Sequence, residues 1–103
     1  MPVIVVATIK PLPEHRDEVR AALQAVIPQV HGEEGCELYT LNQKDDRFVM
    51  IERWASPAAL QTHSTDSAGL QQLNAELKGK LEAPLDVVVL EPVPAGEPAK
   101  GAL

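Results

Sequence analysis

The sequence is short of cysteine, of aromatic residues and of long apolar runs, and each shortage excludes a class of protein. Cys36 is the only cysteine, so no internal disulfide can form and nothing calls for an oxidising compartment. No apolar run approaches the roughly 20 residues that a transmembrane helix needs, and the N-terminus lacks the basic region of a secretory signal. We therefore expect a cytoplasmic protein that does not bind a membrane.

Basic residues are also scarce, because nine Lys and Arg face fifteen Asp and Glu, for a formal charge of -6. They are scattered along the chain, so no basic stripe can bind a phosphate backbone, and we expect no nucleic-acid partner. The 103 residues fit one domain. A core with one Trp, one Tyr and one Phe gains stability by burying a further face on a second copy, which favours a homodimer.

The N-terminal half predicts a strand, a helix and a hairpin. β-Branched residues on both faces of 3–9 predict a central strand, and Pro13 suits the first turn of a helix. The apolar stripe of that helix consists of Val19, Leu23, Val26, Ile27 and Val30. Pro28 inside the stripe predicts a kink or the last helical turn. Strands at 36–43 and 48–54, joined by a polar turn, predict the hairpin.

The C-terminal half predicts two helices and a last strand. Ser56 before Pro57 is a typical helix start, and the Ser, Thr and Asp residues of 64–67 interrupt this helix and cap a longer one. The longer helix carries Leu70, Leu73, Leu77 and Leu81 on one stripe. Residues 86–91 predict a strand, and 94–103 form a Pro- and Gly-rich tail that is too poor in apolar residues to pack alone.

The order of these elements is the split βαβ pattern of an α+β domain, which we place at 1–93. It predicts a four-stranded antiparallel sheet with helices on one face. Apolar residues on the opposite face then need a partner, and two such sheets packed together would cover them. The pattern therefore also favours a homodimer.

Motifs for cofactor and metal chemistry are missing. The sequence has no Gly-rich phosphate loop, no GxSxG elbow and no CxxC pair, and His15, His31 and His63 have no two-ligand spacing. Hydride transfer and metal-dependent hydrolysis are therefore disfavoured, and we expect no metal site. His15 and His31 are interpreted as polar residues at a helix flank and a helix end.

His63 and Trp54 are the first candidate site residues. His63 shares a helix side with Leu60 and follows shortly after the strand that ends at Trp54. In the functional interpretation His63 is a base and the indole of Trp54 contacts a ligand. In the structural interpretation both are core residues, and the sequence alone leaves both interpretations open.

The hairpin supplies the other polar candidates. Tyr39 and Asn42 lie on opposite faces of a regular strand, so at most one of them can enter a given cavity. Glu52 shares a face with Met50 and Trp54, and an unpaired carboxyl in such an apolar setting has a raised pKa. A salt bridge or an exposed rim is the alternative for Glu52.

Three segments, taken together and in this order, resemble one known family. They are Glu33–Tyr39 (EEGCELY), Phe48–Trp54 (FVMIERW), and Ala59-Leu60 with His63 nine residues after the Trp. The sequence resembles the antibiotic biosynthesis monooxygenase domain, including quinol monooxygenases, over roughly residues 3–93.

The resemblance implies a ferredoxin-like fold that pairs into a dimeric α+β barrel. It also implies a cavity between sheet and helices that oxidises a phenolic or quinol-type small molecule with O2, without flavin, haem or metal. Haem-degrading relatives use an Asn on the first strand, a Trp on the helix after the third strand and a later His. Here the first strand offers Ala7 and Thr8, His63 takes the helix position, and no histidine lies near Leu73 and Asn74. Haem degradation is therefore disfavoured.

A cofactor-free oxygenase needs its substrate as an anion, so the main task of the protein is to remove a phenolic proton. Transfer from a phenol of pKa about 10 to an imidazole of pKa about 6.5 is uphill by roughly 5 kcal/mol, and we assign the base role to His63. Tyr39, Trp54 or Asn42 would stabilise the oxyanion, with Glu52 beside them. The expected apolar lining is Val6, Met50, Leu60 and Leu73.

Two other functions fit the same residues. An isomerase of a small oxygenated metabolite would use His63 to shuttle a proton and would turn over without oxygen. A non-catalytic module would bind a small molecule without oxygen uptake, because fold and function are only loosely linked.

Overall fold

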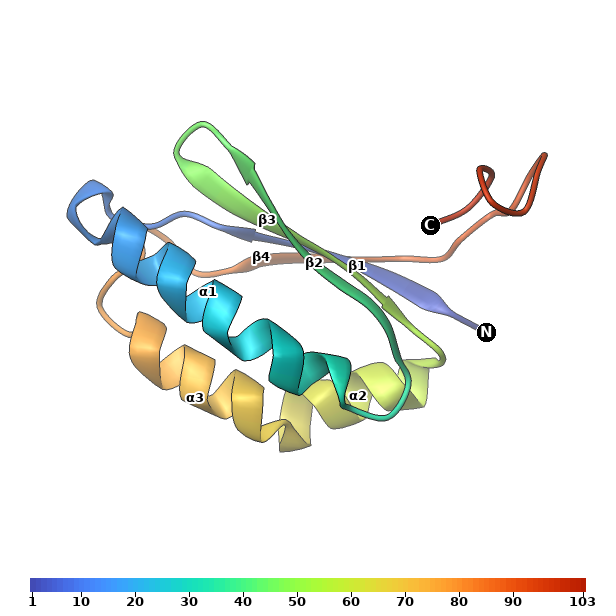
Figure 1. Ribbon diagram of the computed structural model, residues 1–103, viewed down its shortest axis with the longest axis horizontal. Helices are drawn as coiled ribbons and strands as arrows, with labels where there is room; N and C mark the ends of the chain where they lie inside the picture. The colour runs from blue at the N-terminus through green and yellow to red at the C-terminus, as the bar shows by residue number, and fades with distance from the viewer.

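The computed structural model describes all 103 residues and places the helices against one face of a four-stranded sheet (Figure 1). The strands are β1 (Val3–Ile9), β2 (Cys36–Lys44), β3 (Arg47–Trp54) and β4 (Asp86–Leu90). The helices are a short 3-10 helix (Pro13–His15), α1 (Arg16–His31), α2 (Pro57–Asp66) and α3 (Ala68–Leu77). The predicted α+β fold with split βαβ topology is confirmed.

The sheet has the strand order β2-β3-β1-β4, and all neighbouring strands are antiparallel. β1 is therefore a central strand, as its β-branched residues predict. Its register places Val5 opposite Glu52 and Ala7 opposite Met50, and these four side chains face the helices. No helix lies on the other face of the sheet (Figure 1).

A bulge in β2 decides which of its side chains face the helices. The pairing of β2 with β3 slips at Glu37, which adds one residue to β2. Tyr39 then lies opposite Glu52 on the helix side, whereas Asn42 lies opposite Val49 on the other side. The predicted opposite orientation of Tyr39 and Asn42 is confirmed.

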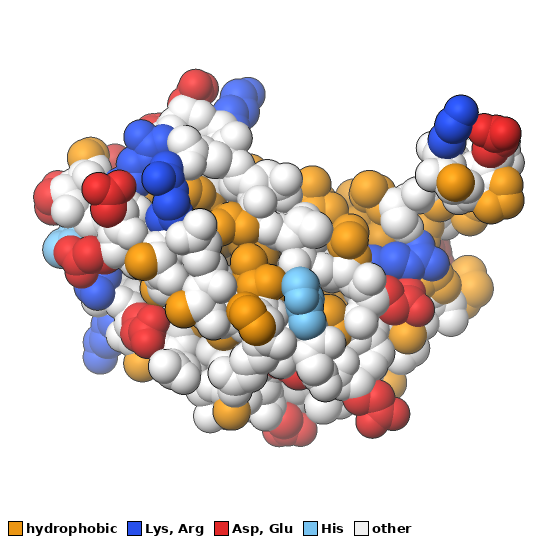
Figure 2. All heavy atoms as spheres, viewed as in Figure 1, with side chains coloured by type: hydrophobic (Ala, Val, Ile, Leu, Met, Phe, Trp, Pro, Cys, Tyr) orange, Lys and Arg blue, Asp and Glu red, His pale blue; other side chains and the backbone are white.

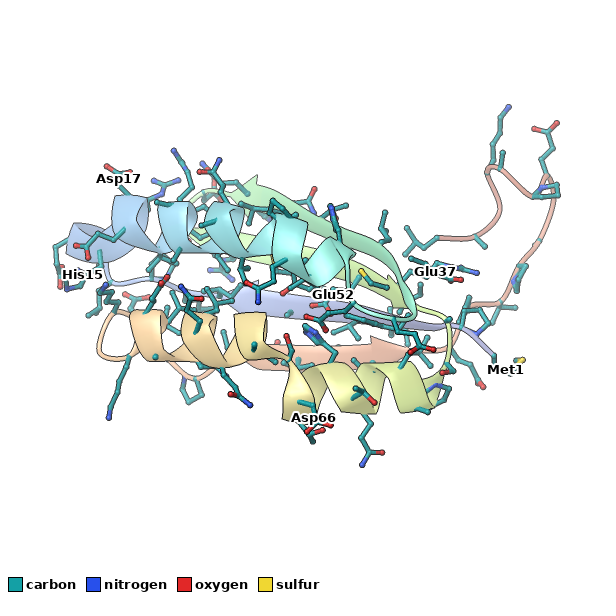
Figure 3. The ribbon with its side chains drawn as sticks, turned by 60° about the horizontal axis from the view of Figure 1, so that its bottom comes forward. Met1, His15, Asp17, Glu37, Glu52 and Asp66 are labelled. Atoms are coloured by element: carbon teal, nitrogen blue, oxygen red, sulfur yellow. The ribbon has the colours of Figure 1, made fainter.

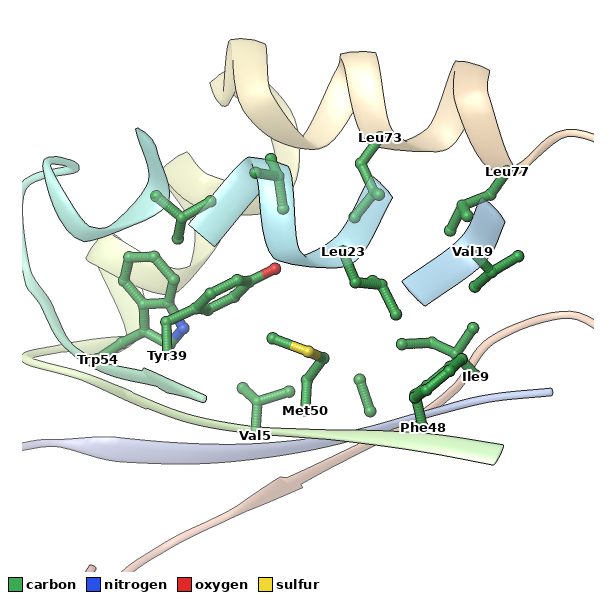
Figure 4. Close-up of a cluster of buried hydrophobic side chains, with 13 residues drawn as sticks. Val5, Ile9, Val19, Leu23, Tyr39, Phe48, Met50, Trp54, Leu73 and Leu77 are labelled. Carbon is green, nitrogen blue, oxygen red and sulfur yellow. The ribbon is translucent and has the colours of Figure 1, made fainter. Parts of the chain in front are cut away.

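A core of thirteen buried side chains fills the space between sheet and helices (Figure 4). Its members are Val5, Ala7, Ile9, Val19, Leu23, Val26, Val30, Tyr39, Phe48, Met50, Trp54, Leu73 and Leu77. Four of them form the buried stripe of α1 that its spacing predicts. Burial of each large apolar side chain contributes about 1.5–3 kcal/mol, so this cluster is the main source of the fold's stability.

Helix α1 continues through Pro28 and ends at His31, so Pro28 lies in the last turn. A single residue, Ser67, separates α2 from α3. Its hydroxyl accepts a hydrogen bond from the backbone N–H of Leu70 at 3.1 Å, which is the N-cap geometry. The prediction that all of 64–67 interrupts the helix was too broad, because 64–66 are still helical.

Helix α3 ends at Leu77, and the predicted extension to Leu81 is wrong. Gly79 has a φ of 78°, a left-handed conformation that ends helices. Leu81 instead forms an isolated β-bridge with Pro11. No helix of the chain combines the length and the apolar character that crossing a bilayer requires.

Strand β4 is an edge strand and is exposed on both faces. Val87, Val88, Val89 and Leu90 each keep between 43% and 55% of their surface exposed. After β4 the chain leaves the sheet as an extended arm (Figure 1). Hydrophobic side chains also reach the surface in the middle of the molecule (Figure 2).

Candidate functional site

The candidate site is a cavity of about 120 Å³ between the sheet and the helices. Its apolar lining includes Val5, Ala7, Leu23, Met50, Leu60, Leu70, Leu73 and Leu77. Ser64, Leu85 and Val87 line it as well and are exposed, so the cavity opens between α2 and β4. Tyr39, Glu52 and His63 are its other polar members, and no Lys or Arg lines it.

His63 reaches the cavity because α2 begins at a firm cap. The Ser56 hydroxyl accepts a hydrogen bond from the Ala59 N–H at 3.1 Å, and Pro57 occupies the first turn. This start places His63 on the inner side of α2, where it is 5% exposed. Its Nδ1 lies 2.8 Å from Glu33 Oε1.

The Glu33 contact fixes the tautomer of the imidazole. A carboxylate only accepts hydrogen bonds, so Nδ1 of His63 carries the proton and donates it to Glu33. In the neutral imidazole Nε2 then keeps its lone pair, and the contact with Glu33 is the only hydrogen bond of the His63 side chain. This arrangement gives His63 one nitrogen that can accept a proton from a ligand in the cavity.

Trp54 and Tyr39 pack around the imidazole. The Trp54 and His63 ring centroids lie 4.5 Å apart at 31°, and the Tyr39 ring meets His63 edge-on at 5.7 Å. Trp54 is fully buried behind the cavity and does not line it. Its Nε1–H donates to Glu52 Oε1 at 3.0 Å. This N–H is therefore not free to bind an oxyanion, which is the role that the sequence analysis offered for it.

Glu52 lies in the space between the sheet and the helices (Figure 3). It is 5% exposed and lines the cavity, so the alternative of an exposed rim is wrong. Burial raises the pKa of its carboxyl above the ordinary value of 4.5, although the Trp54 hydrogen bond and the nearby His63 oppose this rise. The raised pKa predicted for a carboxyl in an apolar setting is confirmed.

Tyr39 is 4% exposed and lines the cavity. Its hydroxyl points away from Trp54 into the core (Figure 4). Burial raises the pKa of the phenol, and the charges of Glu52 and Glu33 raise it further. The Tyr39 hydroxyl therefore stays protonated at neutral pH and is a hydrogen-bond donor for a ligand.

Besides Trp54, two more predicted site residues lie outside the cavity. Val6 pairs with Ile51 on the face of the sheet away from the helices, because alternate residues of β1 face opposite sides. Asn42 shares that face, and its amide donates to Thr40 Oγ1 and to the Val49 carbonyl, each at 3.2 Å. Val6 and Asn42, which the sequence placed in the site, therefore do not line this cavity, whereas Met50, Leu60 and Leu73 do.

The sequence interpretation missed Glu33 and Ser67. Ser67 donates its hydroxyl hydrogen to Glu33 Oε2 at 2.5 Å. Glu33 lies 30 residues before His63, so no local spacing relates them. The one signal was Gly35, whose φ of 82° and close approach to Ala59 bring this loop against α2. No three His, Cys, Asp or Glu side chains gather as metal ligands.

Comparisons with known proteins agree on one family. The family model for antibiotic biosynthesis monooxygenase matches residues 2–74. The Bacillus subtilis protein named "Putative monooxygenase YcnE" is 37% identical over 92 residues, which cover 86% of this chain and 96% of that protein.

Solved structures share the fold. The structure of Rv0793 from Mycobacterium tuberculosis, whose protein is named "Putative monooxygenase Rv0793", superposes with a TM-score of 0.86 at 32% identity and covers 94% of this chain and 100% of that chain. A Deinococcus radiodurans structure titled as a "putative antibiotic biosynthesis monooxygenase" has a TM-score of 0.81 at 25% identity, covering 92% and 96% of the two chains. The ferredoxin-like fold that the sequence predicted is thereby confirmed.

Proposed function

The chain belongs to the antibiotic biosynthesis monooxygenase family, and from this premise we propose that it oxidises a small phenol or quinol with O2 without a cofactor. One observation carries the proposal: His63, whose Nδ1 is held by Glu33, lines an apolar cavity. A phenol becomes a good one-electron donor only as its anion, so a positioned base is the main requirement of this chemistry.

The proposal gives a separate role to each of three residues, His63, Tyr39 and Glu52. His63 Nε2 takes the phenolic proton. The Tyr39 hydroxyl, which is kept neutral by its raised pKa, donates a hydrogen bond to the forming oxyanion, and one well-aimed donor contributes about 3 kcal/mol. Glu52 holds the indole of Trp54 in place behind the imidazole.

The oxidation balances with the substrate and O2 alone. The phenolate gives one electron to O2, which yields an aryloxyl radical and superoxide. Their recombination forms a C–O bond at a ring carbon, and the peroxide takes up a proton. Loss of water then removes the hydrogen of that carbon, breaks the O–O bond and leaves a carbonyl. A phenol and O2 thus become a quinone and water.

Cavity size and charge support a neutral single-ring substrate. The volume of about 120 Å³ compares with the cavity of about 150 Å³ that binds benzene in an engineered protein. The lining offers no Lys or Arg to pair with a carboxylate, and burial of an unpaired carboxylate is costly. We therefore propose a hydroquinone or a catechol with small apolar substituents.

An oxygen electrode tests the function. Chelator-treated protein should consume O2 with a single-ring hydroquinone faster than the enzyme-free rate, and His63→Ala should lower turnover by about 10²- to 10⁴-fold because the base is lost. His15→Ala is the matched control, since His15 lies outside the cavity. Unchanged oxidation by a folded His63→Ala variant would contradict the assignment.

The same experiment separates the other functions. Substrate conversion that continues under nitrogen would favour an isomerase over an oxygenase. Saturable quenching of the fluorescence of Trp54, the only tryptophan, without conversion or oxygen uptake would favour a binding module.

We also propose that two copies pair through the faces of their sheets that carry no helix. This face presents Val6, Val49, Ile51, Val88 and Leu90, and apolar surface of this kind is typical of an interface. A second copy supplies the same surface, and a two-fold axis makes it self-complementary. Dimerisation would also place a partner beside the exposed strand β4.

A further inference from the structure

His63 lines two separate hollows, and no other residue lines both. The first is the apolar cavity already described. The second has a volume of about 280 Å³ and a polar lining that includes Glu33, Glu34, Thr62, Asp66 and Ser67. The imidazole therefore stands between a chamber suited to an aromatic ligand and a hollow suited to water.

Glu33 connects the imidazole to the polar hollow. One carboxylate oxygen accepts from His63 Nδ1 at 2.8 Å, and the other accepts from the Ser67 hydroxyl at 2.5 Å. The Ser67 hydroxyl is itself fixed, because it also accepts the Leu70 N–H that begins α3. The carboxylate is thus held at both oxygens, while 22% of the Glu33 side chain remains exposed.

We propose that Glu33 is a positioning residue and a proton relay, through which His63 exchanges protons with water in the polar hollow. This inference rests on the proposed function, in which His63 is the base. A carboxylate on Nδ1 stabilises the imidazolium that forms when Nε2 takes the phenolic proton. The Nδ1 proton can then pass to Glu33 and on to water, without opening the apolar cavity.

The relay runs in both directions during one turnover. A proton leaves through Glu33 when the phenolate forms, which prevents its return to the oxyanion before O2 reacts. An equivalent proton comes back when the peroxide is protonated. No net proton is released, in agreement with the overall conversion of a phenol and O2 to a quinone and water.

Charged groups around Glu33 favour a cation at this point. Glu34 and Asp66 face the polar hollow, and Figure 3 places Asp66 on the outer side of α2. On the inner side, Glu52 and the thiol of Cys36 lie within range of the Glu33 charge. No Lys or Arg lines either hollow, so an imidazolium has no cation nearby to oppose it.

Chemical rescue tests the relay. Glu33→Ala should lower kcat for hydroquinone oxidation by about 10- to 100-fold, the usual effect of losing the carboxylate partner of a functional histidine. KM should stay within twofold, because Glu33 does not line the apolar cavity. Added acetate should enter the polar hollow and restore kcat in this variant. Glu33→Gln, which leaves no room for acetate, should stay slow.

Glu34→Ala is the matched control, because Glu34 lines the same hollow and has no hydrogen bond to His63. It should change kcat less than twofold and show no response to acetate. A Glu33→Ala variant that keeps the wild-type kcat and pH profile, or one that is slow and unresponsive to acetate, overturns the relay.

A second measurement does not depend on turnover. Spectra of ¹⁵N-histidine-labelled protein should show the Nδ1–H tautomer of His63 in the wild type and its loss in Glu33→Ala. An Nε2–H tautomer in the wild type overturns the proposal. If the Nδ1–H tautomer is present but the protein consumes no O2 with any phenol, the link between Glu33 and His63 is supported and the proposed oxygenase function fails.

Discussion

Glu52 is the only carboxyl that lines the cavity, where it is buried and has no Lys or Arg beside it. Its only side-chain hydrogen bond comes from the indole of Trp54. Ionisation in this position is costly, which is the reason for its raised pKa. The same cost must appear as a dependence of the free energy of unfolding on pH.

We predict that Glu52→Gln becomes increasingly stabilising relative to the wild type as the pH rises. Below the unfolded pKa both states of the wild type are protonated. Between that pH and the raised folded pKa, the unfolded chain loses its proton while the folded protein keeps it, so wild-type stability falls and then levels off. The amide of the variant does not titrate, and its oxygen can still accept the Trp54 N–H.

Urea denaturation of both proteins from pH 4 to pH 8 measures this difference. Glu91→Gln, at an exposed carboxyl, controls for the change in net charge. A stability difference between Glu52→Gln and wild type that stays constant across the pH range would show that burial does not penalise the ionised carboxyl.

At the scale of single residues, the sequence predicted which face of a strand a side chain lies on better than it predicted which side chains contact one another. Strand alternation placed Glu52 and Met50 on the buried face and separated Tyr39 from Asn42, because a side-chain period of two is a local property. The Glu33–His63 contact joins a loop to a helix 30 residues away. Only the packing of α2 on that loop creates it, so no spacing in the sequence could reveal it.

The loop before β2 packs tightly against α2 at Gly35. A Cβ added to Gly35 would lie 2.4 Å from the Cβ of Ala59, and the residue has a φ of 82°. This contact sets the distance between Glu33, two residues earlier, and His63, one helical turn after Ala59. The position of the base therefore depends on a glycine outside the cavity.

We predict that Gly35→Ala lowers the free energy of unfolding by about 2–4 kcal/mol. A left-handed alanine costs roughly 1–2 kcal/mol, and forcing α2 away from the loop adds about as much. Gly79→Ala is the matched control, because Gly79 also has a positive φ but no atom within 4 Å of an added Cβ. Gly79→Ala should lower the free energy of unfolding only by the roughly 1–2 kcal/mol cost of a left-handed alanine.

Equilibrium denaturation measures both variants. Ala59→Gly introduced into the Gly35→Ala protein should recover the part of the loss that comes from overlap. Equal losses for the two glycine variants would mean that α2 and the loop adjust freely.

The elements themselves were largely predictable. Periodicity located β1, α1 and the hairpin because each pattern is local and strong. The end of α3 was missed because Leu81 continues its apolar spacing, whereas Gly79 turns the chain before it. The C-terminal end of α2 was predicted too early, because Ser, Thr and Asp residues occur both at helix caps and inside helices. Ser64 and Thr65 lie inside α2, where their hydroxyls donate to backbone carbonyls one turn earlier.

At the scale of the whole molecule, a charged substitution on β4 tests the proposed dimer, which would form through the sheet face that carries no helix. We predict that Val88→Asp converts a dimer into a monomer at micromolar concentration. Each copy would lose the burial of one valine, worth about 1.5–3 kcal/mol, and a two-fold interface counts this twice. Because Val88 is 45% exposed in the single chain, the monomer should still fold.

Analytical ultracentrifugation at several concentrations checks this prediction. Gln61→Asp, at an exposed position of α2, controls for added charge on the helix side. A wild-type protein that sediments as a monomer at every concentration would contradict the proposed pairing.

The first and last strands of the chain, β1 and β4, are neighbours in the sheet. During synthesis, the edge of β1 that later receives β4 has no partner until Leu90 has emerged from the ribosome. A nascent chain therefore leaves this edge of β1 unpaired until β4 has been made, and such edges invite pairing with other chains. The order in which the strands follow one another thus sets how long this edge is open to wrong pairing.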